Sequence, residues 1–304
     1  MKEALDKVVA DIGQVILGKE HTLRLALTCL IARGHLLIED LPGVGKTTLA
    51  HALAQALGLH FQRIQFTSDL LPADILGVSV FDRNLSEFRF CPGPIFAQVI
   101  LADEVNRSTP KTQSALLEAM EEHQVTIEGT THGLPEPFFV IATQNPTEQV
   151  GTFPLPESQL DRFMMRLEMG YPDQQAERTL LKGRDSRDQL AHMSPSLTPE
   201  RLMAIQEAVV RVHVSDALLD YLQALLGFSR EAPYYKTGLS PRAGLAVRRC
   251  AQAWAFMHGR DHVLPEDVQT VLPSVVNHRL KPAPEFSEHP REEIVNHMVT
   301  VAIP

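Results

Sequence analysis

One short stretch, IEDLPGVGKTT at residues 38–48, constrains the fold of this chain most, because it joins an apolar run to a helical pattern. Its core, GVGKT, fits the end of the phosphate-binding loop pattern G-x-x-x-x-G-K-[S/T]. In such a loop the glycines turn backbone N–H groups toward phosphate oxygens, and the N-terminus of the next helix adds a favourable dipole. The flanking strand and helix favour this interpretation over a tight glycine turn without a ligand. We therefore predict an ATP site formed by Pro42, Gly43, Val44, Gly45, Lys46, Thr47 and Thr48, with Lys46 on the β- and γ-phosphates and the Thr47 hydroxyl at a Mg²⁺ position.

Asp40 stands where the loop pattern has its first glycine. That glycine mainly supplies backbone freedom, which aspartate tolerates well, and the N–H groups that contact phosphate come later, from Gly43 to Thr48. A carboxylate aimed at the phosphates would repel them. We therefore predict that Asp40 points away from the phosphates or pairs with a basic neighbour, and that its replacement by glycine changes ATP affinity little.

Apolar runs alternate with helical patterns through the first half of the chain. The runs lie at residues 35–39, 61–66, 99–103, 137–143 and 164–169, and two of the helical patterns between them lie at 47–57 and 109–122. Near-continuous apolar runs are typical of parallel strands that are covered on both faces. This alternation predicts an α/β domain built on a parallel sheet.

The pattern changes after about Tyr171. Residues 173–199 are polar and predict a helix that leads into a linker. From Pro199 onward strand patterns disappear, and helical periodicity covers 200–212, 215–230, 240–259 and 265–280. We therefore predict two domains, a nucleotide-binding domain over residues 1–190 and an all-helical domain over 191–304.

A second acidic motif follows the run VILAD. The strand Val99–Asp103 ends in Asp103, and Glu104 comes directly after it. At the carboxyl edge of a parallel sheet, beside Lys46, Asp103 could hold Mg²⁺ through its waters and Glu104 could orient and deprotonate an attacking water. Solvated acids at a strand end are common, but the upstream phosphate loop favours one Mg–ATP site.

At this point the chain resembles a known family. The segments LLIEDLPGVGKTTLA, CPGPIFAQVILADEVNRSTPKTQSALLEAMEEHQVTI and ATQNPTEQVGTFPLPESQLDRF resemble the AAA+ ATPases of the MoxR family, densely from Ile12 to about Tyr171 and more weakly through LSPRAGLAV. The resemblance implies an αβα sandwich on a five-stranded parallel sheet, followed by an all-α lid. It also implies hexameric rings and an ATP-driven chaperone, often with partners that carry a von Willebrand factor A domain.

The resemblance assigns roles to three further polar residues. Asn145 resembles sensor 1, which positions the attacking water, and Arg162 resembles the arginine finger that reaches the γ-phosphate of the neighbouring subunit. Arg242, in the first turn of a helix that Ser240 can cap, resembles sensor 2, which would couple nucleotide state to the lid angle. The alternatives are a turn-forming asparagine before proline and a surface arginine paired with Asp161 or with Glu157.

The resemblance also covers the N-terminal segment and two insertions. Ile16 and Leu17 resemble the segment that packs against adenine, although an apolar core segment accounts for them equally well. The insertions at 76–94, with Phe81, Phe88 and Phe90, and at 124–135 predict hairpins. In the family such insertions face the pore of the ring, and ordinary hairpins with buried phenylalanines are the alternative.

Composition narrows the range of partners. The formal net charge of −9 and the pI near 5.8 argue against a general affinity for nucleic acid or anionic membrane. The three scattered cysteines fit a reducing compartment, and neither a signal sequence nor a membrane-spanning run is recognised. We therefore predict a cytoplasmic protein without nucleic acid partners and without membrane insertion.

Two other functions stay open at the level of sequence. One is a DNA-associated motor or loader on the same nucleotide site, which the acidic charge and the lack of a recognisable DNA-binding module disfavour. The other is a nucleotide-controlled assembly switch that hydrolyses little ATP.

Overall fold

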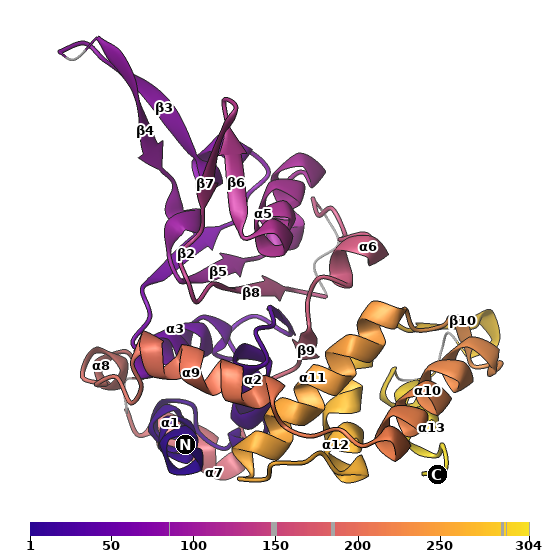
Figure 1. Ribbon diagram of the computed structural model, residues 1–304. Helices are drawn as coiled ribbons and strands as arrows, with labels where there is room; N and C mark the ends of the chain where they lie inside the picture. Colours follow the sequence, from indigo (N-terminus) through magenta and orange to yellow (C-terminus); the bar gives the residue numbers. More distant parts are fainter. Residues whose placement is uncertain (85, 147–150, 184–185, 287–288, 290, 304) are drawn as a thin grey trace.

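Five parallel strands form the central sheet of the molecule (Figure 1). The computed structural model describes residues 1–84, 86–146, 151–183, 186–286, 289 and 291–303. The strand order of the central sheet is β2-β5-β8-β1-β9, and every neighbouring pair is parallel. The strands are β1 (Leu36–Glu39), β2 (Phe61–Gln65), β5 (Val99–Asp103), β8 (Phe139–Gln144) and β9 (Met165–Leu167). They fall on the five predicted apolar runs, so the predicted parallel sheet is confirmed.

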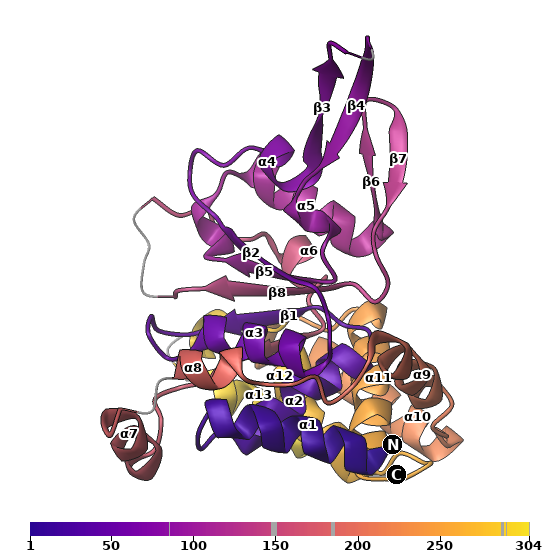
Figure 2. The ribbon, with the colours of Figure 1, turned by 90° about the vertical axis from the view of Figure 1, so that its left-hand side faces the viewer.

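Side chains that alternate along the strands enter two hydrophobic cores, one on each face of the sheet. Leu36 and Ile38 belong to the core shared with α1, α2 and α3, whereas Leu37 belongs to the core shared with α5. Figure 2 shows the same layers, with α1 to α3 on one side of the sheet and α4 and α5 on the other. The predicted αβα sandwich is therefore confirmed. The helices of these layers are α1 (Lys2–Val15), α2 (Glu20–Ile31), α3 (Lys46–Ala56), α4 (Pro72–Leu76), α5 (Pro110–Glu122) and α6 (Glu157–Leu160), with short 3₁₀ turns at Pro94–Phe96 and Val105–Arg107.

The C-terminal part is mostly helical and packs against the sheet domain. Helix α11 contacts α2 and α12, and α12 also contacts β9. The helices that follow β9 in the chain are α7 (Gln174–Leu181), α8 (Ser186–Ala191), α9 (Pro199–Val210), α10 (Asp216–Glu231), α11 (Pro241–Met257), α12 (Pro265–Val276) and α13 (Arg291–Val299), with a 3₁₀ turn at Pro284–Phe286. Of these, α8 contacts α1 and α3 of the sheet domain. The predicted domain boundary at residues 190 and 191 falls at the end of α8, and this division stays a proposal.

One detail of the helical prediction is wrong, because the C-terminal part also contains a small antiparallel ribbon. Its strands are β10 (Tyr235–Thr237) and β11 (Lys281–Pro282). Two residues, one of them a proline, are too few to show an alternating pattern, so the sequence carries no strand signal there. Within the described ranges, none of the helices combines the length and the apolar character that a bilayer crossing requires.

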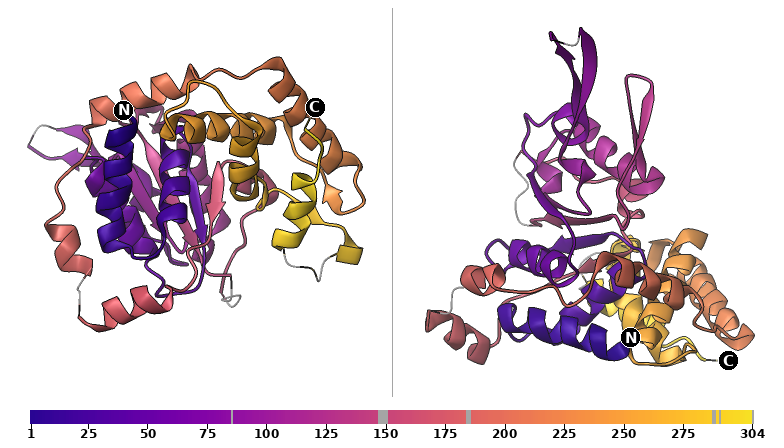
Figure 3. Two further views of the ribbon diagram at one scale, coloured as in Figure 1. Left: turned by 90° about the horizontal axis from the view of Figure 1, so that it is seen from below. Right: turned by 60° about the vertical axis from the view of Figure 1, so that its left-hand side comes forward.

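Two hairpins project from the sheet domain on the side away from the C-terminal helices (Figures 1 and 3). They pair β3 (Gly77–Asp82) with β4 (Glu87–Pro92), and β6 (Gln124–Ile127) with β7 (Thr130–Gly133), so both predicted hairpins are confirmed. Phe90 of the first hairpin stacks on His132 of the second, with ring centroids 4.2 Å apart. Phe81 and Phe88 are 49% and 71% exposed, so the alternative of buried phenylalanines is wrong for these two.

Candidate functional site

The loop between β1 and α3 has the backbone of a phosphate cradle. Gly43 and Gly45 both have positive φ, +85° and +96°, a region that favours glycine, and Gly45 is the N-cap of α3. Apart from Gly43 and its two chain neighbours, no atom lies within 4 Å of the point where a Cβ on Gly43 would stand, so there is open space beside this glycine. The Lys46 ammonium donates to the carbonyl oxygens of Asp40 and Leu41. This arrangement fits a polyphosphate, which would offer the lysine a stronger acceptor.

The Asp40 carboxylate points away from the cradle, as predicted. Its Oδ2 accepts hydrogen bonds from the backbone N–H groups of Met169 and Gly170, both at 2.6 Å, and its Oδ1 accepts one from Leu41 at 2.7 Å. The side chain is buried and ties the start of the loop to the segment after β9. Aspartate at this position therefore links two segments that a glycine would leave unconnected.

Replacing Asp40 by glycine is expected to lower the free energy of unfolding by about 1–3 kcal/mol, because the N–H groups of Leu41, Met169 and Gly170 lose their acceptor. ATP affinity should change little, since the carboxylate does not face the phosphates. Thermal unfolding and calorimetric titration with ATP measure the two quantities. A tenfold or larger gain in ATP affinity would instead show that Asp40 repels the nucleotide.

The acidic pair lies at the carboxyl edge of the sheet within a network of polar side chains. Asp103 accepts the Thr143 hydroxyl at 2.6 Å through Oδ1, and Arg63 at 2.7 and 3.0 Å through Oδ2. The Glu104 N–H donates to the same Thr143 oxygen at 2.9 Å. The Thr143 hydroxyl therefore bridges the two acids, because it donates to the Asp103 carboxylate and accepts from the Glu104 N–H.

Glu104 has a backbone conformation that is uncommon for a residue other than glycine, with φ +57°. Its Oε2 accepts from Gln65 at 3.0 Å and pairs with Arg107 at 3.2 Å. A left-handed residue held in place by its surroundings often marks a functional position. Glu104 follows the carboxyl end of β5, the same end of the sheet at which Lys46 follows β1, and this position suits a base for an attacking water.

The donor set suits magnesium only together with a nucleotide. The Thr47 hydroxyl and the Asp103 carboxylate are hard oxygen ligands of the kind that Mg²⁺ prefers. Among the described residues, no group of three or more His, Cys, Asp or Glu side chains could hold a metal ion. A Mg²⁺ ion here would therefore take most of its ligands from phosphates and water, as magnesium commonly does in nucleotide sites.

Two further predicted positions lie near the cradle. Asn145 follows β8 and is buried at the same edge of the sheet as Asp103, because β8 pairs with both β5 and β1. Ile16 lies against the loop: a Cβ on Gly45 would stand 3.9 Å from its Cδ1. Leu17 is half-buried. The catalytic role of Asn145 and the adenine contact of Ile16 and Leu17 stay predictions.

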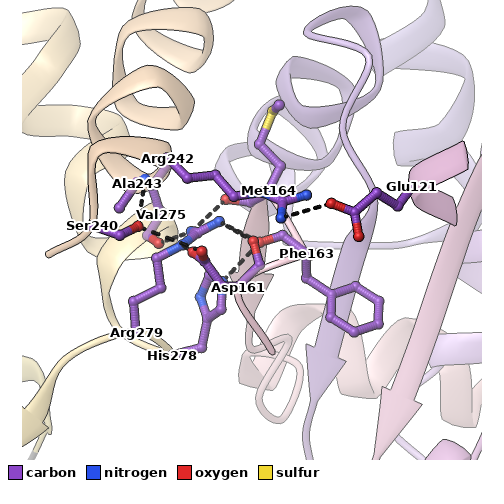
Figure 4. Close-up of polar contacts among 10 residues, drawn as sticks. All are labelled: Glu121, Asp161, Phe163, Met164, Ser240, Arg242, Ala243, Val275, His278 and Arg279. Carbon is purple, nitrogen blue, oxygen red and sulfur yellow. Dashed lines mark hydrogen bonds and ion pairs between the residues drawn. The ribbon is translucent and has the colours of Figure 1, made fainter. Parts of the chain in front are cut away.

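Arg162 and Arg242 meet at one carboxylate that the sequence did not single out. Glu121, near the end of α5, pairs with Arg162 at 2.8 Å and with Arg242 at 3.1 Å. Figure 4 shows Arg242 reaching Glu121 from the first turn of α11. The alternative partners expected for Arg162 are engaged elsewhere, since Asp161 pairs with Arg279 and Glu157 with Lys281.

This arginine pair lies at the amino ends of the strands, whereas the phosphate loop lies at their carboxyl ends. The loop follows the carboxyl end of β1, whereas Arg162 precedes β9, whose Met165 is the partner of Leu36 at the start of β1. A strand rises about 3.3 Å per residue, so the two ends of β1 lie roughly 10 Å apart along the strand alone. Arg242 was expected to resemble sensor 2 and to couple nucleotide state to the lid angle. In this structure it lies beside Arg162 and not beside the phosphate loop.

A cavity of about 220 Å³ opens next to the arginine pair. His35 lies on the wall of this cavity. Burial lowers the pKa of His35 to about 4, so its imidazole is neutral at pH 7. The ring forms hydrogen bonds with the backbone of Met120 and Val140. The charge of the cavity therefore comes from its arginines and two carboxylates. The charged lining residues are Arg33, Glu121, Asp161, Arg162, Arg242, Arg249 and Arg279.

Comparison with known proteins gives concordant results. The family model described as "ATPase family associated with various cellular activities (AAA)" matches residues 35–165, and the "AAA lid domain" model matches residues 227–298. The chain is 44% identical to the uncharacterized protein YeaC of Bacillus subtilis, over 97% of this chain and 93% of that protein. It is 38% identical to chaperone MoxR1 of Mycobacterium tuberculosis, over 91% of this chain and 75% of that protein. A crystal structure of a candidate ATPase from Cytophaga hutchinsonii has a TM-score of 0.90 at 36% identity, and the match covers 99% of this chain and 94% of that one.

Proposed function

The chain belongs to the MoxR family of AAA+ ATPases, and from this premise we propose that it hydrolyses Mg-ATP within a ring of identical subunits to remodel or mature a protein client. The observation that carries the proposal is the division of charged residues between the carboxyl ends and the amino ends of the strands. At the carboxyl ends, Lys46 and the acids Asp103 and Glu104 lie at an open phosphate cradle. At the amino ends, Arg162 and Arg242 lie side by side. Such a molecule has one half of an ATP site at each end of the strands, and a head-to-tail ring brings the two halves from neighbouring subunits together.

Each residue then has a defined task. Backbone N–H groups from Gly43 to Thr48 and the Lys46 ammonium hold the phosphates, and Asn145 and Glu104 orient a water molecule at the γ-phosphate. Mg²⁺, held by Thr47 and by Asp103 through water, would neutralise developing phosphate charge. Arg162 of the neighbouring subunit stabilises the transition state, with Arg242 beside it.

The two projecting hairpins are the proposed contact with the client. The first hairpin, β3–β4, exposes the apolar side chains of Val78, Val80, Phe81 and Phe88, which would bind unfolded or partly folded protein segments. A partner with a von Willebrand factor A domain and a ring of six subunits are the finer forms of this proposal, as is a location in the cytoplasm. The acidic net charge supports a protein client over DNA.

The ATPase rate per subunit, measured over a wide range of protein concentration, tests whether the site is shared. We expect the rate to rise with concentration and to level off once light scattering shows complete assembly, because each site then has a neighbour. Removal of Mg²⁺ with EDTA should abolish turnover. A rate per subunit that is independent of dilution, with monomers throughout, would contradict the shared site.

A further inference from the structure

Two residues just after the C-terminal end of α12, His278 and Arg279, hold the short segment that carries Arg162. Arg279 uses all five of its N–H groups there (Figure 4). Nε donates to the Asp161 carboxylate at 2.6 Å, and Nη2 donates to the carbonyl oxygens of Asp161 and Phe163 at 3.1 and 2.7 Å. Nη1 donates to the carbonyl oxygens of Met164 and of Val275 in the last turn of α12. His278 adds a bond between its Nε2 and the Phe163 carbonyl at 2.9 Å.

This contact differs from an ordinary surface ion pair. The Arg279 side chain is only 5% exposed, and its guanidinium is surrounded by carbonyl oxygens of residues on both sides of Arg162. Burial lowers the pKa of Arg279 and the Asp161 carboxylate opposes that shift, so the buried charge is paired. A planar fork with five donors fixes the backbone of the segment in a way that a lysine cannot reproduce.

The same segment also contacts the start of α11. Ser240 caps α11 by accepting the Ala243 N–H, and its hydroxyl lies 3.5 Å from the free oxygen of the Asp161 carboxylate. Arg242, in the first turn of the same helix, meets Arg162 at Glu121. Side chains therefore connect the 161–164 segment both to the residues after α12 and to the start of α11.

We propose that Arg279 is a positioning residue that fixes Arg162 to the lid helices, so that Arg162 and Arg242 enter the ATP site of the neighbouring subunit together. This inference rests on the proposed function. It adds that a change in the lid angle of one subunit moves both arginines in the site of the next subunit. Arg279 is buried against the 161–164 segment, and its effect on hydrolysis passes through Arg162.

Replacing Arg279 by methionine is expected to lower kcat by roughly 10- to 100-fold, because a small displacement of a group at the transition state is enough for such a loss. KM for ATP and the binding of a fluorescent ATP analogue should stay within about twofold, since the phosphate loop lies at the other edge of the sheet. Arg279→Lys should recover part of kcat, because it keeps the ion pair with Asp161 without the fork. Asp161→Asn, which keeps an oxygen for Nε, should give a smaller loss of the same kind if the methionine variant folds poorly.

Arg260→Met is the matched control, because Arg260 pairs with the buried Asp267 in the same group of helices but does not contact the 161–164 segment. It should lower thermal stability without the loss in kcat. A kcat loss in Arg260→Met equal to that in Arg279→Met would reduce the role of Arg279 to general stability and overturn the proposal.

Subunit mixing separates this inference from the proposed function. Arg279→Met subunits mixed with Glu104→Gln subunits should regain activity, because an intact arginine pair from the second variant completes the site of the first. Arg162→Ala mixed with Glu104→Gln serves as reference. Recovery in the reference alone would overturn the role of Arg279, whereas recovery in neither mixture would overturn the shared site and the inference with it.

Discussion

Replacing Glu104 by glutamine is expected to lower the steady-state ATPase rate by about 10²–10⁴-fold, the usual contribution of a positioned general base. Glutamine has the same shape but cannot accept the proton of the attacking water. It can still bond to Gln65 and lie near Arg107, so the local structure should survive. The hydrolysis rate is measured by phosphate release with saturating ATP.

ATP binding and ATP-dependent assembly of Glu104→Gln should match the wild type, because the phosphates are held by Lys46 and the loop. Glu118→Gln, an exposed change on α5, is the control and should leave the rate unchanged. Equal and slow hydrolysis by wild type and Glu104→Gln, with assembly intact in both, would favour a nucleotide-controlled switch over an ATP-driven machine.

Replacing Arg162 by alanine is expected to lower kcat by about 10³-fold, the lower end of the range for a guanidinium that neutralises transition-state charge from outside the subunit. The phosphate loop of the same subunit is intact, so the dissociation constant for ATP should change little. Without Arg162, Glu121 still pairs with Arg242, so the fold should tolerate the change. Phosphate release and nucleotide titration give the two values.

Arg201→Ala, which removes an exposed arginine at the start of α9, is the control for a loss of positive charge. A tenfold or greater loss of ATP affinity in Arg162→Ala, with kcat unchanged, would place Arg162 in ground-state binding and contradict its proposed role.

The sheet and the phosphate loop were predictable because their signals are local. Each parallel strand is an apolar run, and the glycines of the loop and Lys46 are adjacent in the chain. Even the orientation of Asp40 followed from simple electrostatics, although its acceptor role toward Met169 and Gly170 did not. Those two N–H groups lie 129 and 130 residues away, beyond the reach of any pattern in the sequence.

The polar network of the site was missed because it depends on strand order. Arg63 and Gln65 contact Asp103 and Glu104 only because β2 lies beside β5, with Gln65 opposite Asp103. In the sequence the run FQRIQF shows only two polar residues on one side of a strand. That pattern does not show which strand lies beside it in the sheet.

The arginine cluster could not be assembled from the sequence either. Glu121, Arg162 and Arg242 come from three segments that meet only after the helices of the C-terminal part pack on α2 and β9. Family resemblance assigned roles to the two arginines without indicating that they share a carboxylate. Arg279 carried no motif, and its importance is visible only in its contacts.

The central claim, that each ATP site is completed by Arg162 of the next subunit, is tested most directly by mixing two inactive variants. Arg162→Ala and Glu104→Gln subunits are combined in equal amounts before ATP is added, and phosphate release is measured against each variant alone. Random mixing places an intact Glu104 beside a neighbour's intact Arg162 in about one half times one half, or one quarter, of the interfaces of a ring. We predict that the mixture hydrolyses ATP at about a quarter of the wild-type rate per subunit. A mixture that stays at the average of the two inactive variants, although light scattering shows mixed assemblies, would contradict the claim.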